Sequence, residues 1–566
     1  MGYILGISYG YHDSAACLLK DGIILGACEE ERFTGIKHDY SFPKHTISWL
    51  YEKFNITKDD IQEVAFYDNP NKKLSRIKWS TLRGGIFNYF KRKKIVKRNE
   101  ELVIDIENNI KKYTNSKVNI YYCDHHLSHV AYSFYTSPFK EALILSVDGV
   151  GEWETTTLYH GENTQLKKLD KIKFPNSLGM LYSTMTAFLG FKPNEGEYKV
   201  MGLAPYGNPI NYLNKFKKLY KSFSNGKFKL NMKYFTFDYS DRIMFNYKLP
   251  MLLGMSPRNP ESEFKQKHKD LAATVQSEYE FLFFKLINKL YGYGLSNNIC
   301  LSGGCAYNGT ANGKILKDSK FQNLWIPPAP SDAGSSIGAA LYLYFSKNKN
   351  APRLNNQNPY LGPHYTKEEV IEALESFKDK IDYRKDIHTN IINNTADYIK
   401  DNKVVGWFEG RMEFGARALG NRSILANPRD PDMKRKLNAV VKKREGFRPF
   451  APIVLKRDQE RYFQYDKDVL YMNQVVQVRK KYHEDLPAIT HIDGSARIQT
   501  LDKSNHARMY RLLERLKEVN EYPIVLNTSF NLKDQTMVLD PKSAIQTFLN
   551  CDMDVLVIEN YFITKK

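Results

Sequence analysis

Two histidines with helical spacing are the first candidates for chemistry in this sequence. His125 and His129 stand four residues apart in the segment HHLSH (125–129), so on a helix both imidazoles lie on one face. Such a pair is typical of a metal clamp, although a histidine cluster at a helix start also occurs without a metal. A strand expected at 142–147 ends at Asp148, beside a glycine-containing turn. Two imidazoles with a carboxylate oxygen suit iron(II), manganese or zinc.

A second carboxylate stands in the proline-rich loop PPAPSDAG (327–334), ahead of a helix expected at 337–344. Ser331 or Asp332 could cap that helix, which is the simpler interpretation. Asp332 could instead be a metal ligand or lie at a phosphate site. Both interpretations stay open at this point.

Glycine and arginine residues offer two further candidate sites. Gly303 and Gly304 follow a strand expected at 299–302 and could let the backbone approach a nucleotide, although a lone Gly-Gly is weak evidence. The stretch GRMEFGARALGNRS (410–423) sets three arginines among glycines and one glutamate. Arginine binds oxyanions through two parallel hydrogen bonds, so we favour a phosphate or carboxylate cradle over salt-bridged surface arginines.

These residues need an α/β framework to position them. Near the N-terminus the pattern predicts three strands, at 3–8, 14–19 and 23–27, and helical and strand patterns alternate from there to about residue 345. The segment 346–362 is rich in Asn, Lys and Pro and is typical of a linker. The alternation resumes after it and includes a helix expected near 432–441. No internal repeat is visible. Two α/β domains are therefore expected.

Composition narrows the class of protein. The 566 residues are 42% hydrophobic and 26% charged, as in an ordinary globular protein. No run of about 18 apolar residues occurs, so no membrane span is expected. The N-terminus lacks a basic leader, and the six cysteines are scattered without a CxxC pair. We therefore expect a cytoplasmic protein with reduced cysteines.

The charge is unevenly distributed. The net charge is +20, and residues 72–98 hold eleven Lys or Arg and no Asp or Glu, with aromatic residues between them. The simpler interpretation is a solvated helical surface. The alternative is contact with an anionic partner or with a membrane surface.

Nine stretches together resemble the O-carbamoyltransferase family, which includes the tobramycin, cephamycin and nodulation-factor carbamoyltransferases. They run in family order from residue 1 to beyond residue 530: GISYGYHDSAACLLKDGIILGACEEER, DHHLSHVAYSFY, SVDGVGE, GEYKVMGLAPYG, LSGGCAYN, PSDAGSSIGAAL, GRMEFGARALGNRSILANPR, REGFRPFAP and NTSFN.

The resemblance implies an N-terminal ASKHA domain of the actin-like ATPase type at 1–345, a linker at 346–362 and a YrdC-like domain at 363–566. It implies that the second domain cleaves carbamoyl phosphate and joins the carbamoyl group to AMP from ATP, which would be bound with Mg²⁺. Carbamoyl adenylate then passes within the protein to the first domain. There a divalent metal, Fe(II) in first place and Mn or Zn as alternatives, and bound nucleotide position it for attack by an acceptor hydroxyl.

The same resemblance assigns roles to individual residues. The metal ligands would be His125, His129, Asp148 and Asp332, and the catalytic histidine would be His12. Gly303, Gly304 and Asn308 would contact the adenylate. The carbamoyl phosphate and ATP contacts of the second domain would be Arg417, Arg422, Lys443, Arg444, Arg497 and Asn527.

One loop departs from the family pattern. The family follows NTSFN with Gly-Glu-Pro, whereas Asp534 and Gln535 stand here in place of the glycine and the glutamate. This puts the shape of the loop in doubt.

The resemblance leaves the acceptor as a small-molecule or sugar-type hydroxyl compound, with no nucleic acid favoured. Rival hypotheses are threonylcarbamoylation of tRNA and a non-catalytic regulator that binds nucleotide and metal. The hydrogenase-maturation carbamoyltransferases combine related domains in the opposite order and carry CxxC zinc modules, which are absent from this sequence.

Overall fold

The computed structural model describes residues 2–80, 82, 89–240, 242–441 and 445–566. It divides into two compact units, each described here by itself. The first comprises Met1–Gly26 and Tyr40–Gln357, and the second comprises Ala27–Asp39 and Asn358–Lys566. The units differ from the continuous ranges expected from the sequence, because the short segment Ala27–Asp39 belongs with the C-terminal part of the chain.

The chain begins with a five-stranded sheet in the order β3-β2-β1-β4-β5. β1 is antiparallel to β2 and parallel to β4, and β4 is parallel to β5. A two-residue turn joins β2 to β3, as expected for a hairpin. The strands are Tyr3–Ser8 (β1), Ala15–Lys20 (β2), Ile23–Glu29 (β3), Ile61–Phe66 (β4) and Asn119–Tyr122 (β5).

A second sheet in the first unit repeats this topology, in the order β8-β7-β6-β11-β12. β6 is antiparallel to β7, β7 is antiparallel to β8, and β6 and β12 both run parallel to β11. The two sheets therefore form a structural repeat, although no repeat is visible in the sequence. The strands are Glu141–Val147 (β6), Glu154–Glu162 (β7), Gln165–Lys173 (β8), Asn298–Ser302 (β11) and Asn323–Trp325 (β12).

Helices α5 (His125–Tyr135) and α13 (Asp332–Lys347) pack between the two sheets of this repeat. α13 packs against β1, β2 and β4, α5 packs against β6, β7 and β11, and the helices pack against each other. Glycine permits this close approach: a Cβ on Gly338 of α13 would stand 1.9 Å from the carbonyl oxygen of Ser128 in α5. The packing brings the start of α13 next to the first turn of α5.

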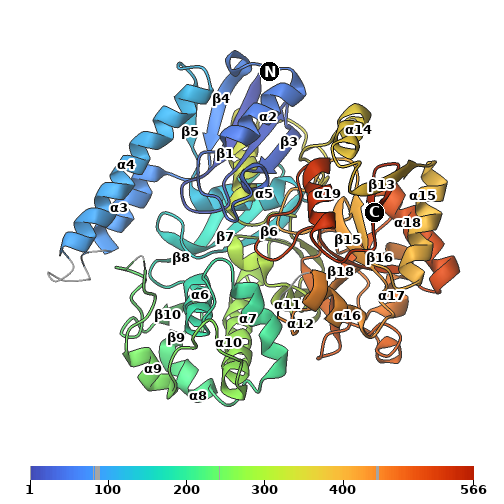
Figure 1. Cartoon of the computed structure of the whole chain (residues 1–566). Helices are drawn as coiled ribbons and strands as arrows, with labels where there is room; N and C mark the ends of the chain where they lie inside the picture. Colours follow the sequence, from blue (N-terminus) through green and yellow to red (C-terminus); the bar gives the residue numbers. More distant parts are fainter. Residues whose placement is uncertain (1, 81, 83–88, 241, 442–444) are drawn as a thin grey trace. The chain divides into compact units, whose positions relative to one another are not determined.

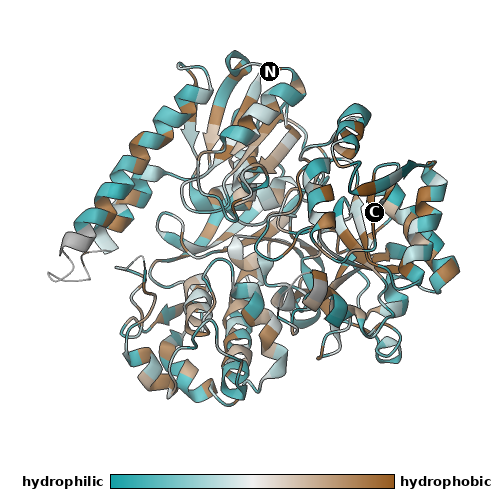
Figure 2. Ribbon diagram, viewed as in Figure 1, coloured by the Kyte–Doolittle hydropathy of each residue, from teal (hydrophilic) through white to brown (hydrophobic). Residues whose placement is uncertain are grey.

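The remaining helices of the first unit surround this centre. α3 and α4 lie side by side and extend away from the first sheet (Figure 1), and α4 is mostly hydrophilic (Figure 2). α10 packs against α6, α7 and α8, near a small hairpin of β9 (Tyr220–Ser222) and β10 (Phe228–Leu230). The helices are α2 (Lys44–Phe54), α3 (Pro70–Ser80), α4 (Tyr89–Tyr113), α6 (Leu178–Phe188), α7 (Glu197–Leu203), α8 (Leu213–Phe216), α9 (Lys248–Leu253), α10 (Gln266–Tyr291), α11 (Gly309–Asn312) and α12 (Ile315–Asp318).

The second unit is built on a nine-stranded mixed sheet in the order β13-β21-β20-β14-β15-β19-β16-β18-β17. Its strands are Ile381–Lys385 (β13), Val405–Phe408 (β14), Arg422–Ala426 (β15), Ala451–Leu455 (β16), Gln474–Gln477 (β17), Ser495–Leu501 (β18), Ile524–Ser529 (β19), Val555–Ile558 (β20) and Tyr561–Lys565 (β21). Its helices are α1 (Glu31–Thr34), α14 (Lys367–Glu375), α15 (His388–Lys400), α16 (Met433–Lys436), α17 (Gln459–Tyr462), α18 (Ala507–Asn520) and α19 (Pro541–Leu549).

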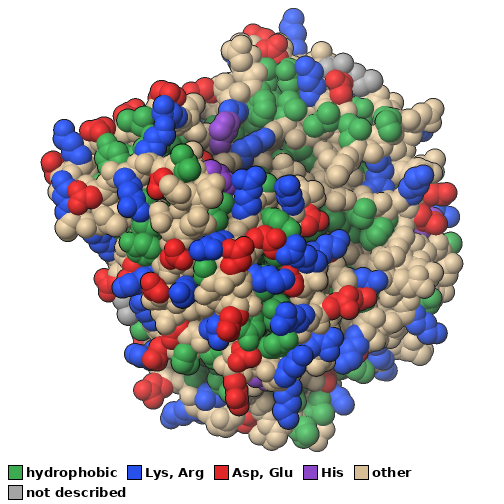
Figure 3. Space-filling model, turned by 90° about the vertical axis from the view of Figure 1, so that its right-hand side faces the viewer, with side chains coloured by type: hydrophobic (Ala, Val, Ile, Leu, Met, Phe, Trp, Pro, Cys, Tyr) green, Lys and Arg blue, Asp and Glu red, His purple; other side chains and the backbone are tan. Residues whose placement is uncertain are grey.

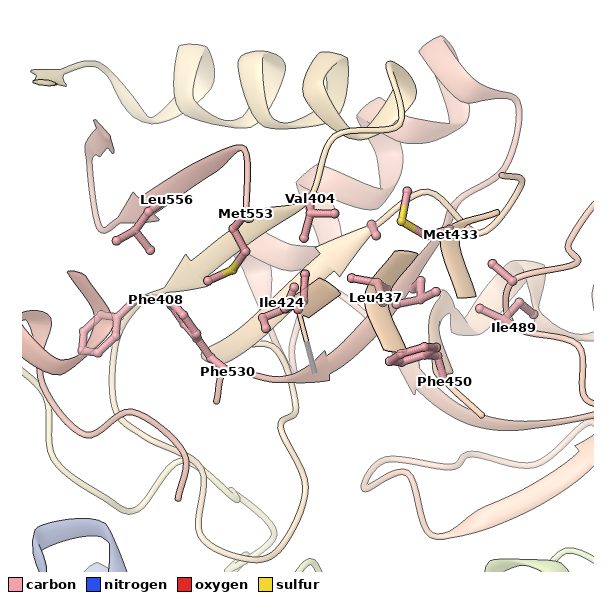
Figure 4. Close-up of a cluster of buried hydrophobic side chains, with 14 of the residues drawn as sticks. Val404, Phe408, Ile424, Met433, Leu437, Phe450, Ile489, Phe530, Met553 and Leu556 are labelled. Carbon is pink, nitrogen blue, oxygen red and sulfur yellow. The ribbon is translucent and has the colours of Figure 1, made fainter. Parts of the chain in front are cut away.

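Apolar side chains from the strands and their covering helices form the core of this unit. Figure 4 shows Val404, Phe408, Ile424, Phe530 and Leu556 within this cluster. The segment Ala27–Asp39 joins the unit through hydrogen bonds from Arg32 to the carbonyl of Gly415 and from the amide of Gly415 to Glu29.

The predicted α/β class is confirmed, and the expected strands and helices form with shifts of a few residues at their ends. One element differs: the helix expected near 432–441 is the short α16 followed by a π-helical segment, Leu437–Val441. None of the six cysteines, all of which are described, forms a disulfide bond. Among the described residues, no helix is long and apolar enough to cross a membrane.

Candidate functional site

Four predicted ligands come together in the first unit from three elements. His125 and His129 lie in the first turns of α5, Asp148 directly follows β6, and Asp332 is the first residue of α13. One ligand atom from each lies within 4.8 Å of every other. Ser331, at the N-cap of α13, makes no capping hydrogen bond through its side chain. The carboxylate of Asp332 is instead turned towards the two histidines.

The spacing of these atoms fits a bound divalent cation. Nε2 of His125 lies 3.1 Å from Nε2 of His129 and 3.1 Å from a carboxylate oxygen of Asp148. Asp332 Oδ1 lies 3.5 Å from Nε2 of His129 and 3.6 Å from Nε2 of His125. Metal bonds of about 2.1 Å place adjacent ligand atoms about 3.0 to 3.4 Å apart. The nitrogen and oxygen donors also match the ligands of iron(II), manganese and zinc.

Neighbouring groups fix the orientation of two ligands. Ser335 Oγ lies 2.9 Å from Nδ1 of His129, which leaves Nε2 to face the cluster. The amide of Gly304 donates to Asp148 Oδ1 at 2.8 Å, so the other carboxylate oxygen is free to face the histidines. His129 and Asp332 are almost completely buried, and buried ligands of this kind are held rigidly.

The carboxylates and imidazoles of the cluster shift one another's pKa values. Burial raises the pKa of Asp148, but its contacts with His125 and His129 outweigh this and keep the pKa well below its usual range. Burial alone would lower the pKa of His129, but the carboxylates of Asp148 and Asp332 outweigh it and raise the pKa to about 9. The carboxylates are therefore held in the ionised form that binds a cation.

His126, between the two clamp residues, is a structural histidine. Its ring nitrogens contact Ser146 Oγ at 3.1 Å and the carbonyl of Glu154 at 3.1 Å. Burial, together with the neighbouring His125, lowers its pKa to about 3. It packs as a neutral side chain and is not one of the four clustered residues.

His12 lies at the edge of the cluster, on the turn between β1 and β2. Its Nε2 is 3.8 Å from Asp332, and its Nδ1 is 3.0 Å from Asp13. Burial lowers the pKa of His12, but the carboxylates of Asp332 and Asp13 outweigh it and hold the pKa well above its usual value. The side chain keeps some exposure, 20%, so it remains accessible to a small molecule.

The predicted nucleotide contacts begin directly after β11, where Gly303 and Gly304 adjoin the end of β6 and Asp148. Gly303 has φ of +84°, and a Cβ there would stand 2.3 Å from the carbonyl oxygen of Val147, so the turn requires glycine. Asn308 accepts from the amide of Ala311 at the start of α11 and exchanges hydrogen bonds with Gln276. Its side chain is already engaged in holding this loop.

In the second unit the arginine-rich stretch folds around a glutamate. Glu413 Oε1 accepts from the backbone amides of Leu419, Asn421 and Arg422. The Arg422 guanidinium is fully buried, donates to the carbonyls of Glu409, Asn421, Pro363 and Gly410, and lies over the ring of Phe408. This geometry favours a structural role for Arg422 over a phosphate contact.

The other predicted contacts of this unit are differently placed. Arg417 and Arg497 are half-buried. Asn527, on β19, donates to the carbonyl of Ala418 at 3.0 Å, which brings it to the loop that carries Arg417. Lys443 and Arg444 lie outside the described residues.

The loop after NTSFN keeps a backbone shape that glycine would adopt. Asp534, at the position where the resemblance expects glycine, has φ of +61°. Gln535 closes the loop, because its side chain accepts from the amide of Leu532 and its carbonyl accepts from Asn531. Asp tolerates this left-handed conformation better than most residues.

Comparison with known proteins identifies the family. The model "Carbamoyltransferase N-terminus" matches residues 3–341, and "Carbamoyltransferase C-terminus" matches residues 396–565. The chain belongs to the carbamoyltransferase family and is an enzyme of that class. The predicted family is thereby confirmed.

Relatives match along most of the chain. An uncharacterized protein of Synechocystis is 38% identical, with 100% of this chain and 97% of that protein covered. Nodulation protein NolNO of Sinorhizobium fredii is 35% identical, with 98% of this chain and 79% of that protein covered. Component A of (R)-2-hydroxyglutaryl-CoA dehydratase from Acidaminococcus fermentans is 15% identical at a TM-score of 0.33, over 62% of this chain and 100% of that chain. A TM-score of 0.33 is too low to support a conclusion about this chain.

Sequence reasoning missed two residues near the site. Ser335 orients His129 but looks like any helical serine in sequence. Arg76 of α3 is buried and has as a neighbour Glu152, which accepts from the amide of His125. In the sequence it is only one cation of the basic segment 72–98, part of which lies outside the described residues.

Proposed function

We propose that this enzyme is an ATP-dependent O-carbamoyltransferase whose first unit transfers the carbamoyl group and whose second unit activates it. The observation that carries the proposal is the cluster of His125, His129, Asp148 and Asp332 with His12 at its edge. In this proposal the ASKHA-type domain spans residues 1–345 and the YrdC-like domain spans residues 363–566. The two sheets of identical topology in the first unit support an actin-like architecture for it.

Activation is assigned to the second unit. Water hydrolyses carbamoyl phosphate to carbamate and inorganic phosphate, and a carbamate oxygen then attacks the α-phosphorus of ATP, so that pyrophosphate leaves and carbamoyl adenylate forms. Mg²⁺ would accompany ATP. Arg417 and Arg497 supply positive charge, and Asn527 is held against the carbonyl of Ala418, near Arg417. Lys443 and Arg444 remain proposed contacts on the strength of the resemblance alone.

Transfer is assigned to the first unit. A divalent ion, Fe(II) in first place and Mn or Zn as alternatives, held by the four ligands would supply Lewis acidity and offset the charge of the adenylate. The backbone of Gly303 and Gly304 permits close approach of the nucleotide, with Asn308 holding the loop. AMP is a good leaving group once the acceptor oxygen has attacked the carbamoyl carbon.

His12 is the proposed base for the acceptor hydroxyl. If Nδ1–H donates to Asp13, Nε2 remains to take the proton. The charge of Asp332 is the strongest influence that raises the pKa of His12. Offsetting that charge would return the imidazole to the neutral form that a base needs.

The acceptor is proposed to be a small-molecule or sugar-type alcohol, acted on in the cytoplasm. Lys and Arg side chains lie among Asp and Glu over the face shown in Figure 3. They are not gathered into one patch there, so nothing on that face favours nucleic acid.

The test uses the full-length protein with ATP, Mg²⁺ and carbamoyl phosphate. We expect AMP and pyrophosphate only when carbamoyl phosphate is present, and transfer to a hydroxyl acceptor only when the metal is bound. Absence of pyrophosphate release would overturn the proposal and would favour a non-catalytic regulator.

A further inference from the structure

Arg76 of α3 is a buried cation without a hydrogen-bond or ion-pair partner among the described residues. Its side chain is only 8% exposed. Among the residues that the structure describes, nothing accepts a hydrogen bond from its guanidinium, and its Nε is enclosed without a partner. Burial lowers the pKa of Arg76 to about 10. An arginine this deeply buried is normally paired, since an unpaired charge inside a protein is costly.

Two other buried arginines of this protein make several hydrogen bonds, although among the described residues the Nε of Arg422 also has no acceptor. Arg258 donates to the carbonyls of Leu189, Pro260 and Ser262, and Arg422 also donates to backbone carbonyls. The unpaired state is therefore particular to Arg76 among these three.

The acids nearest Arg76 are committed elsewhere. Asp68 pairs with Lys73 at 2.9 Å. Glu152 Oε1 accepts from the amides of Asn69 and His125 at 2.8 and 2.9 Å. On its apolar side the guanidinium lies over the ring of Phe174, with Cζ 5.1 Å from the ring centroid. A planar guanidinium that is held against an aromatic ring can form two parallel hydrogen bonds to a carboxylate or a phosphate.

The position of Arg76 relates it to the transfer site. Glu152 ties the residue before α3 to the start of α5, where the ligand His125 lies. Lys73, one helical turn before Arg76, places its ammonium 5.7 Å from the ring centroid of Tyr11. The Tyr11 ring in turn lies 4.7 Å from that of His12. Tyr11 is therefore a neighbour both of the proposed base and of the turn of α3 that carries Lys73 and Arg76.

We propose that Arg76 binds an anionic group, a carboxylate or a phosphate, on the acceptor whose hydroxyl is placed at His12. This rests on the proposed function and narrows its acceptor to an alcohol that carries negative charge. Arg76 makes two parallel hydrogen bonds to the oxyanion.

Stability distinguishes this role from a structural one. A residue that is retained for binding commonly lowers the stability of the protein without its ligand. Replacing the unpaired guanidinium by the apolar side chain of methionine therefore leaves the melting temperature unchanged or raises it. If Arg76 served only to pack α3, Arg76→Met would lower the melting temperature.

The binding test uses calorimetry on the full-length protein with three probes: glucuronate, glucose 6-phosphate and methyl glucoside. Wild type should bind at least one anionic sugar more tightly than the neutral one, and which of the two binds separates carboxylate from phosphate. Arg76→Met should weaken that binding at least tenfold, Arg76→Lys should restore part of it, and Arg98→Met, which removes an exposed arginine of α4, should leave it unchanged.

Wild type that shows no preference for an anionic sugar would overturn the inference, as would Arg76→Met that binds as wild type does. Pyrophosphate release by wild type is measured on the same preparation. If wild type releases no pyrophosphate, the proposed function is contradicted. Whether Arg76 binds an anion is still decided by the binding measurements on Arg76→Met.

Discussion

The hydroxyl of Ser335 lies 2.9 Å from Nδ1 of His129, although 206 residues separate the two in sequence. This contact selects which ring nitrogen of His129 faces Asp148 and Asp332. Partners of this kind typically change metal affinity by about 10- to 100-fold.

Ser335→Ala is therefore expected to weaken metal binding by at least about tenfold with the fold intact. Ser336→Ala is the matched control, because Ser336 is equally buried but donates to the carbonyl of Ala333 in its own helix. Metal titration of both apo-variants checks the prediction. Equal affinities in the two variants would show that Ser335 does not orient the ligand.

His129→Ala should lose the metal and carbamoyl transfer but still release pyrophosphate, because activation is assigned to the second unit. Some loss of stability is expected as well, since two carboxylates are left with one imidazole fewer. His126→Gln serves as the control, because His126 contacts Ser146 and Glu154 instead of the cluster. Metal content, melting temperature and both half-reactions are measured. Normal transfer by His129→Ala would remove His129 from the metal site.

Arg417 and Arg422 should respond differently to alanine substitution. Arg417→Ala should abolish ATP–pyrophosphate exchange in a folded protein, because this half-buried side chain is a proposed phosphate contact. Arg422→Ala should instead destabilise the second unit by several kcal/mol, because each buried carbonyl left unsatisfied costs about 1 to 3 kcal/mol. Exchange assays and urea unfolding separate the two effects. Full exchange by Arg417→Ala would exclude that residue.

His506 should make the second unit sensitive to acid. Burial lowers its pKa to about 4, and Nδ1 accepts from the amide of Met509 while Nε2 contacts Asn421. Between pH 6.5 and 4 the unfolded chain binds a proton at His506 and the folded chain does not, so stability falls as pH falls. From pH 7.5 to 5.0 the loss is about 2 kcal/mol. Urea unfolding at both values should show a smaller loss for His506→Gln; equal losses would contradict this.

Gly338→Ala should separate α5 from α13, because the new Cβ would meet the Ser128 carbonyl. We expect a destabilisation of about 1 to 3 kcal/mol, as for overpacked cores, and weaker metal binding. Gly35→Ala is a useful comparison, because no atom lies within 4 Å of its added Cβ and its φ of +71° tests backbone strain alone. Wild-type metal affinity in Gly338→Ala would show that the helix contact does not position the ligands.

The ligand set was largely predictable from sequence. Helical spacing placed His125 and His129 together, and the end of a strand placed Asp148. Asp332 stayed ambiguous between cap and ligand, because only the packing of α13 on α5 turns its carboxylate towards the histidines. The burial of Arg422 was hidden for a similar reason: its partners are backbone carbonyls, which leave no trace in side-chain patterns.

From residue periodicity alone, only the α/β class of the architecture was predictable. Periodicity gave the strands and helices, but it does not encode which strands pair, so the two sheets of identical order emerged from the structure alone. The unpaired state of Arg76 was equally invisible, since an arginine in a basic segment gives no sign of its acidic neighbours being engaged elsewhere.

The membership of Ala27–Asp39 in the second unit has a consequence for synthesis of the chain. More than 300 residues separate this segment from the start of its own unit at Asn358. At about 5 to 20 residues per second, a ribosome needs roughly 15 to 60 s to cover that distance. During this time Glu29 and Arg32 lack their common partner Gly415. A fragment that begins at the linker would lack the segment permanently, so the second unit should be produced with residues 27–39 supplied, for example as a separate peptide.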